Sequence, residues 1–341
     1  MDTILTACRV TEMKAINRLV NQKGDDDYFD RLFSYFQSQF YEKIIEFVQI
    51  RNSVFLLITD KHTYILKGYH SYNRLKIQEA FTATLRKEGF FQTYRFLAPS
   101  VKEQLFFEGT YFGCIEYIYP NKTAFSFLTE KNRREGIELL EQFHRTTATF
   151  ETRYRTLIPK GHISEKWTER LHTFSNHLPF LKYFMNDPFL SEIISWGEWS
   201  LTGIEKHRSF FRQEPLVILH GDVAHHNFLR DRNGSLHLID FDLISVGPPS
   251  FDYLQYANRI LPFIDWSFEK LAGLKQIRNH LQEEAFLYAL AYPADIFREW
   301  NRLIREKLYT DQVKLRQVMD LSIGQFYSRK KFIDQLQEKV K

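Results

Sequence analysis

Residues 217–242, VILHGDVAHHNFLRDRNGSLHLIDFD, decide how the rest of this chain is interpreted. An apolar strand is predicted from Leu216 to Leu219, followed by His220-Gly221-Asp222, and Asn227 lies five positions after Asp222. Two further short strands flank Asn233-Gly234, a two-residue hairpin signal, and the second of them leads to Asp240. Because a hairpin returns the chain to the edge it left, we expect Asp222, Asn227 and Asp240 to lie together, although 18 positions separate the two aspartates.

These three side chains match the chemistry of a metal–phosphate site. Magnesium prefers hard oxygen ligands, takes few of them from protein, and completes its shell with phosphate oxygens and water. Asn227 and Asp240 suit that role, and Asp222 can orient a substrate hydroxyl. The alternative is a hairpin with ordinary surface Asp and Asn residues; spacing, strand context and residue types together favour the site.

The same residues carry a resemblance to a known family. His220-Gly221-Asp222, Asn227 and then Ile239-Asp240-Phe241-Asp242 resemble the aminoglycoside phosphotransferase and choline kinase group, which has the protein-kinase-like fold. Protein kinases carry His-Arg-Asp and Asp-Phe-Gly at these places. Gly221 and Asp242 therefore favour the branch that acts on small molecules.

The resemblance implies an α+β fold with two lobes, the small lobe built on an antiparallel sheet and the large lobe mostly helical. We expect an N-terminal helical extension over residues 1–43, a small nucleotide-binding lobe over 44–118 and a large lobe over 119–341 that contains the catalytic loop.

Composition excludes several classes of protein. The 341 residues are 44% hydrophobic and 26% charged, with a net charge of +4 and both signs mixed along the chain, so nucleic acid is not an expected partner. Two isolated cysteines, Cys8 and Cys114, favour a reducing compartment such as the cytoplasm. No apolar run is long enough to span a bilayer, and the first residues lack the pattern of a signal peptide. We therefore expect no membrane association.

Hydrophobic periodicity predicts the order of elements. Helices are expected at 1–22 and 28–43, followed by a meander of strands at 44–50, 54–59 and 63–69, a helix at 75–88, and strands at 96–102 with 104–107 and at 111–119. From residue 129 the pattern is mainly helical, with segments at 131–150, 164–176 and 188–208, several more after Phe251, and a helical C-terminal stretch at 307–341.

Within the first lobe, the resemblance assigns nucleotide contacts. Lys67, inside the third strand, would hold the phosphates and pair with Glu79 on the next helix; Glu88 is the competing partner. The turn Arg51-Asn52-Ser53 contains no glycine, unlike the phosphate-covering turn of many kinases, so we expect Ser53 to offer only backbone contacts there. Backbone groups of Glu116, Tyr117 and Ile118 would bind adenine.

Three residues are expected to support the catalytic loop without contacting substrate: His220, Asp242 and Asp252. Asp252 follows Gly247-Pro248-Pro249 at the start of a helix, where a carboxylate is stabilised by free amides. His144 is expected to be a packed or capping histidine.

The resulting hypothesis is an ATP- and Mg²⁺-dependent phosphotransferase acting on a hydroxyl of a small-molecule acceptor that the sequence does not identify. Weak motifs late in the chain, such as Leu290-Ala291-Tyr292-Pro293, resemble spore-coat kinase-like proteins of endospore-forming bacteria. The alternative is therefore a spore-coat structural or binding protein with little activity, with spore-coat proteins as partners and the spore coat as location. A protein kinase is a weaker third reading, because no Ala-Pro-Glu segment follows Asp240.

Overall fold

The structure, a computed structural model, describes residues 25–340. The helix predicted at 1–22 lies outside these residues. The described chain forms two compact units: unit 1 comprises the chain up to Ser126 together with His225–Asp242, and unit 2 comprises Phe127–Ala224 together with the chain from Leu243 onward. Each unit is described by itself below.

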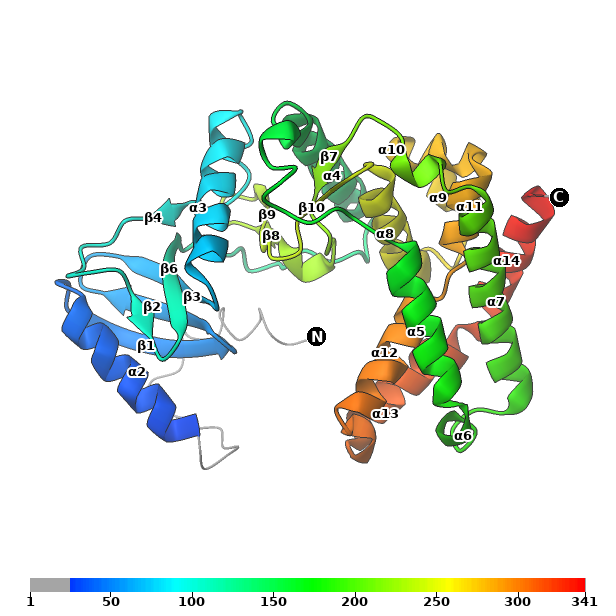
Figure 1. The fold of residues 1–341 in the computed structure, drawn as a ribbon, viewed down its shortest axis with the longest axis horizontal. Helices are drawn as coiled ribbons and strands as arrows, with labels where there is room; N and C mark the ends of the chain where they lie inside the picture. The colour runs from blue at the N-terminus through cyan, green and yellow to red at the C-terminus, as the bar shows by residue number, and fades with distance from the viewer. Residues whose placement is uncertain (1–24, 341) are drawn as a thin grey trace. The chain divides into compact units, whose positions relative to one another are not determined.

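Unit 1 is built on an antiparallel sheet in the order β1-β2-β3-β6-β4, with β5 paired to β6 (Figure 1). The strands and helices of this sheet region are α2 (Asp25–Gln39), β1 (Ile44–Arg51), β2 (Val54–Thr59), β3 (Thr63–Tyr69), α3 (Tyr72–Lys87), β4 (Phe96–Leu97), β5 (Phe106–Phe107) and β6 (Thr110–Glu116). The predicted meander and both helices are confirmed. The strand expected at 96–102 is much shorter, since Pro99 cannot donate to a ladder.

Alternation along the strands assigns each face of the sheet to one helix. On one face, Leu66 of β3 and Phe112 of β6 join a buried core with Phe36 of α2. On the other face, Gly113 lies so close to α3 that an added Cβ would stand 2.7 Å from Leu75. Because Lys67 is the neighbour of Leu66, strand geometry directs its side chain away from the α2 core.

The hairpin that returns to unit 1 consists of β8 (Phe228–Arg230) and β9 (Leu236–Leu238), preceded by the short 3₁₀ turn η3 (His225–Asn227). The predicted hairpin is confirmed, but its turn is longer than two residues. The Asp231 amide donates to Ser235 O at 2.9 Å, the Gly234 amide donates to Asp231 O at 2.9 Å, and Gly234 has φ +89°. A type I turn followed by a left-handed glycine is the usual three-residue solution.

Unit 2 is mostly helical and contains one small antiparallel pair, β7 (Val217–Leu219) with β10 (Ser245–Gly247). Its α-helices are α4 (Glu130–Ala148), α5 (Ser164–Asn176), α6 (Leu178–Leu181), α7 (Asp187–Lys206), α8 (Ser250–Ile260), α9 (Phe268–Ala272), α10 (Lys275–Arg278), α11 (Glu284–Leu290), α12 (Ala294–Arg305), α13 (Gln312–Met319) and α14 (Phe326–Lys339). Short 3₁₀ turns lie at Glu151–Arg153, Phe210–Arg212, Leu261–Phe263, His280–Gln282 and Leu308–Thr310.

The C-terminal stretch is helical, as predicted, but it is divided into several helices. Lys307 adopts φ 54°, which ends α12, and Asp311 starts α13 anew by accepting from the amides of Val313 and Lys314 at 3.0 and 3.2 Å. A π-helical turn, Asp320–Gly324, then separates α13 from α14. Because charged residues are spread evenly along this segment, hydrophobic periodicity alone does not reveal where its helices end.

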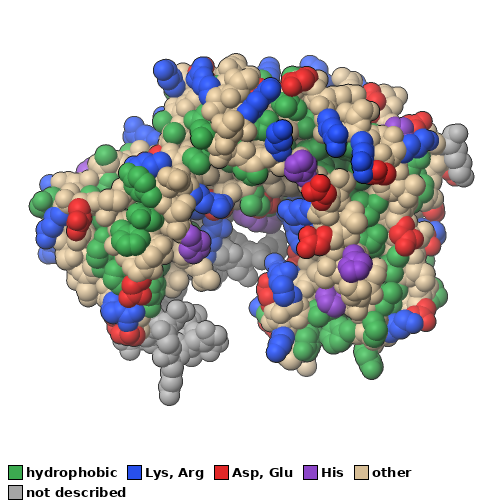
Figure 2. All heavy atoms as spheres, in the orientation of Figure 1, with side chains coloured by type: hydrophobic (Ala, Val, Ile, Leu, Met, Phe, Trp, Pro, Cys, Tyr) green, Lys and Arg blue, Asp and Glu red, His purple; other side chains and the backbone are tan. Residues whose placement is uncertain are grey.

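Charged side chains of both signs are interspersed on the face drawn in Figure 2, as the mixed composition predicts. Among residues 25–340, no helix combines the length and the apolarity needed to cross a bilayer.

Candidate functional site

The centre of unit 1 is an ionic cluster at the end of the β8–β9 hairpin. Lys67 Nζ lies 2.8 Å from Asp240 Oδ1 and 2.8 Å from Asp242 Oδ2, and Arg51 Nη2 lies 2.6 Å from Asp240 Oδ2. The side chains of Lys67 and Asp240 are only 9% and 18% exposed, so solvent screens their attraction little. Burial alone would raise the pKa of Asp240, but Lys67 and Arg51 together hold it well below its usual range. Asp240 is therefore a fixed negative charge at neutral pH.

Helix α3 holds the segment that carries these carboxylates. Gln78 Nε2 donates to Phe241 O at 2.8 Å, and Arg74 Nη2 donates to Asp242 O at 2.9 Å. The Phe241 side chain is fully buried, with its ring 5.3 Å from that of Phe81. Asp240 itself has φ 70°, a left-handed conformation that aspartate tolerates better than most residues. The backbone turn and its anchors thus aim Asp240 and Asp242 at Lys67.

The ion pair expected between Lys67 and Glu79 is absent among the described residues. Glu79 Oε2 instead lies 2.6 Å from Lys76 Nζ, one turn earlier on the same helix. Gln78 occupies the inward position because it shares the buried stripe of Leu75, while Glu79 lies beside that stripe. The position of each residue around the predicted helix, rather than family analogy, favours Gln78 and Arg74 over Glu79 as residues that contact the segment around Asp240.

Asn227 lies beside Asp240 in unit 1. Its side chain is buried, and its backbone oxygen accepts from the amide of Ile239 at 2.9 Å, which fixes it next to the end of β9. One oxygen of Asp242, Oδ1, is buried without a hydrogen-bond partner among the described residues. An ionised carboxylate, an amide and an unsatisfied carboxylate oxygen form a donor set that suits a hard cation.

No cluster of three or more His, Cys, Asp or Glu side chains with the arrangement of a metal site occurs in residues 25–340.

The glycine-free turn between β1 and β2 brings a charge to this cluster. Arg51 extends from the end of β1 to Asp240, a role that the sequence analysis does not assign to it. Ser53 takes the left-handed conformation with φ 57°, and its backbone carbonyl oxygen accepts from the Gly68 amide at 2.7 Å. A contact between Ser53 and phosphate stays a prediction.

Asp222 belongs to unit 2, at the end of β7. Its neighbour Gly221 has φ 79°, and an added Cβ would stand 2.2 Å from Leu243 O, so only glycine fits between His220 and Asp222. The Asp222 side chain is 31% exposed, and Oδ1 lies 3.2 Å from Nη2 of Arg259 on α8. The Asp222 carboxylate is thus accessible and faces a cation. That Asp222 converges with Asn227 and Asp240 stays a prediction.

Asp252, at the start of α8, braces this loop. Its carboxylate accepts from the amides of His220 and Gly221 at 2.7 and 3.0 Å, and lies 2.9 Å from His144 Nε2. Burial would raise the pKa of Asp252, but His144 and the backbone donors lower it. His144 is a packed histidine tied to Asp252, and Asp222 is held in turn by its own amide, which donates to His220 Nδ1 at 3.2 Å.

Gln255 supplies a second brace that the sequence analysis misses. Its side-chain oxygen accepts from the Val223 amide at 2.6 Å, and its nitrogen donates to Gly221 O at 2.9 Å. It lies one helical turn after Asp252, so both residues face the loop from the same side of α8.

The residues expected to contact adenine line a pocket of about 340 Å³ within unit 1. Neither Lys67 nor Asp240 lines it, so the structure does not join it to the ionic cluster. The full lining is Arg86, Phe91, Thr93, Glu116, Tyr117, Ile118, Tyr119, Asp231, Arg232, Asn233 and His237. Glu116 is already paired with Arg95 at 3.0 Å, and adenine binding by residues 116–118 stays a prediction.

Comparison with known proteins identifies relatives. A model described as the phosphotransferase enzyme family matches residues 46–290. A crystal structure of an aminoglycoside phosphotransferase from Alicyclobacillus acidocaldarius is similar with a TM-score of 0.68 at 16% identity, covering 97% of this chain and 99% of that one. Spectinomycin phosphotransferase in complex with ADP and spectinomycin gives 0.55 at 16% identity, over 91% and 98% of the two chains.

A choline kinase from Streptococcus pneumoniae is similar with a TM-score of 0.51 at 13% identity, over 92% of this chain and all of that one. At such low identities these likenesses show the fold. The fold is that of the kinase-like phosphotransferases, and the predicted α+β class with an antiparallel N-terminal sheet and a helical C-terminal region is confirmed.

Proposed function

Because the chain belongs to the phosphotransferase enzyme family, we propose that it transfers the γ-phosphoryl group of ATP, with magnesium, to a hydroxyl of a small molecule. The observation that carries the proposal is the cluster in which Lys67 and Arg51 meet Asp240 and Asp242. Phosphoryl transfer depends mainly on positioning and charge stabilisation, and this cluster supplies both kinds of charge at one point.

Asp240 and Asn227 would hold magnesium, with the unpaired Oδ1 of Asp242 as a further ligand. When bound, the metal would supply positive charge that offsets the negative charge of the phosphates. Lys67 would then turn its ammonium group to the phosphates, as would Arg51 from the β1–β2 turn. Gln78 and Arg74 keep the carboxylates in place, and Ser53 would add a backbone contact.

Asp222 would orient the acceptor hydroxyl and take its proton. The acceptor oxygen forms a bond to the γ-phosphorus while the bond from that phosphorus to the bridging oxygen of ADP breaks, and the hydroxyl proton passes to the Asp222 carboxylate. Asp252, through the amides of His220 and Gly221, keeps the loop in the conformation that presents Asp222.

Calorimetric titration of the whole protein with ATP, with and without Mg²⁺, tests this function. We expect binding that depends on Mg²⁺ and is weakened in Asp240→Asn, while Asp30→Asn, on the exposed side of α2 in the same unit, changes nothing. Absence of Mg²⁺-dependent binding in the wild type would refute the enzyme and favour the alternative of a spore-coat protein that keeps the fold without activity.

A further inference from the structure

Lys67 is a buried strand lysine with two carboxylate partners. Its ammonium group lies 2.8 Å from Asp240 Oδ1 and 2.8 Å from Asp242 Oδ2, and its side chain is only 9% exposed. Asp240 is the more enclosed of the two carboxylates, at 18% exposed against 35% for Asp242. An ammonium group this far from solvent is costly to leave without an anion, so each carboxylate matters for where Lys67 lies.

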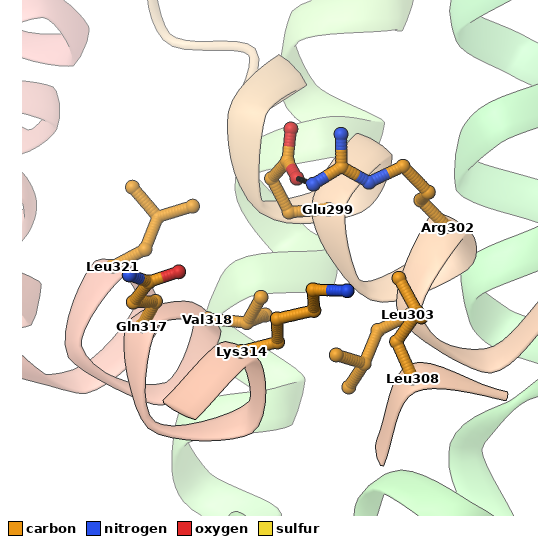
Figure 3. Close-up of a pocket in the computed structure, with 8 residues that line it drawn as sticks. All are labelled: Glu299, Arg302, Leu303, Leu308, Lys314, Gln317, Val318 and Leu321. Atoms are coloured by element: carbon orange, nitrogen blue, oxygen red, sulfur yellow. Dashed lines mark ion pairs between the residues drawn. The ribbon is translucent and has the colours of Figure 1, made fainter. Parts of the chain in front are cut away.

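Helix α3 does not supply the carboxylate that a kinase-like lysine is expected to meet. Within its bounds the one acidic residue is Glu79, which lies 2.6 Å from Lys76 one turn earlier. This pair is local to its helix, like the Glu299–Arg302 pair at 2.7 Å that Figure 3 draws beside the pocket between α12 and α13. A pair of this kind joins two side chains of one helix and does not hold a group on a neighbouring strand.

Helix α3 instead anchors the segment that carries Asp242. Gln78, which is 3% exposed, occupies the inward position of the helix, and its Nε2 donates to Phe241 O at 2.8 Å. Arg74, one turn earlier, donates to the backbone oxygen of Asp242 at 2.9 Å. Two donors on one helix therefore fix the backbone that bears the Asp242 carboxylate, and Oδ2 of that carboxylate meets Lys67.

Lys67 needs this second carboxylate most when Asp240 is engaged elsewhere. In the proposed function Asp240 turns to Mg²⁺, which leaves the buried ammonium group with one anion fewer. Asp242 Oδ2, at 2.8 Å, is the partner that Lys67 keeps. An ammonium group has three N–H donors, so Lys67 can hold Asp242 with one of them and direct the others to phosphate oxygens.

We propose that Asp242 is the positioning residue of Lys67: its Oδ2 holds the ammonium group in the orientation in which it meets the phosphates. A glutamate on the corresponding helix performs this task in protein kinases. The inference rests on the proposed function and names a residue that this function requires. Without Asp242, Lys67 keeps its charge but loses the contact that directs it.

A double-mutant cycle tests the inference, with the dissociation constant of ADP measured by calorimetry on the full chain at saturating Mg²⁺. The cycle combines Lys67→Met and Asp242→Asn, each alone and both together. Asp242→Glu keeps the carboxylate, and Glu79→Gln is the matched control, because it removes the same charge from the partner that the family resemblance favours.

Thermal melting confirms that each variant is folded, and Asp242→Ser takes the place of Asp242→Asn if the latter is not. If Lys67→Met binds ADP too weakly to measure, Lys67→Arg, which keeps the charge but moves the donors, replaces it in the cycle.

We expect Asp242→Asn alone to weaken ADP binding by about tenfold, but to weaken it by less than about twofold when Lys67→Met is already present. Asp242→Glu should stay within about threefold of the wild type, and Glu79→Gln should bind as the wild type does. Equal losses with and without Lys67→Met would show that Asp242 acts on the metal or on the fold, and would overturn the inference. A loss of affinity in Glu79→Gln would overturn it as well. Absence of Mg²⁺-dependent ADP binding in the wild type would instead remove the proposed function itself.

Discussion

Replacing Asp252 by Asn is expected to destabilise unit 2 and loosen the Asp222 loop. The buried carboxylate accepts from two amides and from His144, and hydrogen bonds to a charged group contribute about 1.5–3 kcal/mol each. Asn keeps one accepting oxygen but turns an NH₂ donor toward other donors. Since breaking a buried charged network usually costs about 3–5 kcal/mol, we expect a loss in that range and a fall in Tm of about 10 °C.

Chemical denaturation and thermal melting measure this change, and hydrogen exchange of the amides of His220 and Gly221 locates it. The matched control is Asp265→Asn in the same unit, where the side chain is 87% exposed and pairs with Lys270, so that a change below about 0.5 kcal/mol is expected. If Asp252→Asn were no more destabilising than Asp265→Asn, the bracing role of Asp252 would be wrong.

The same variant gives a test by pH. The folded-state pKa of Asp252 lies below its unfolded value of about 3.9, so its stabilisation is present above that pH and is lost as the pH falls through the folded pKa. Wild type should therefore lose stability below about pH 4 more steeply than Asp252→Asn, which has no carboxylate to protonate. Parallel curves for the two proteins in acid would contradict this account.

Three further predictions concern the two sites. Asp222→Asn should lower turnover by about 10²–10⁴-fold with nucleotide binding nearly intact, whereas Asp240→Asn should weaken Mg²⁺–ATP binding itself; equal loss of binding in both would show that the roles are assigned wrongly. Gln78→Ala should cost about 1–2 kcal/mol by denaturation and weaken nucleotide binding, while Glu79→Ala, whose partly exposed side chain pairs with Lys76, should do neither. Gly221→Ala should cost at least about 1–2 kcal/mol, because it combines a positive φ with a clash against a backbone oxygen, and a melting curve like that of wild type would refute this.

Local pattern predicts most of the sheet in unit 1. Strands at Val54–Thr59 and Thr63–Tyr69 agree with the predicted bounds, because apolar and β-branched residues there are interrupted by short polar turns. The break at Lys307 could not be predicted, since a left-handed lysine leaves no compositional signal. Pro99, in contrast, argues in the sequence itself against the long strand expected at 96–102, because proline cannot donate to a strand ladder.

The candidate site also contains some residues that the sequence predicts and others that it does not. The motif predicts Asp240, Asn227 and Asp252 from their residue types and spacing, and the structure brings Lys67, a strand lysine in need of a partner, to Asp240. Glu79 was the wrong partner for Lys67, because it was chosen by family analogy and not by its position around helix α3, where Gln78 and not Glu79 lies on the buried side. The contact of Arg51 with Asp240 could not be predicted from the sequence, since it joins positions 189 residues apart and depends on tertiary structure alone.

The charge balance of the cluster in unit 1 links metal and nucleotide. Lys67 and Arg51 face Asp240 and Asp242, so two positive charges already satisfy two negative ones. A polyphosphate arriving alone would have to draw Lys67 away and leave two partly buried carboxylates without this partner, which is costly. In the proposed function, a divalent cation bound to the carboxylates would remove that cost and free both side chains for the phosphates. The glycine-free turn fits this proposal, because Arg51 would supply charge where many kinases supply glycine amides, and phosphate binding would then depend on the metal.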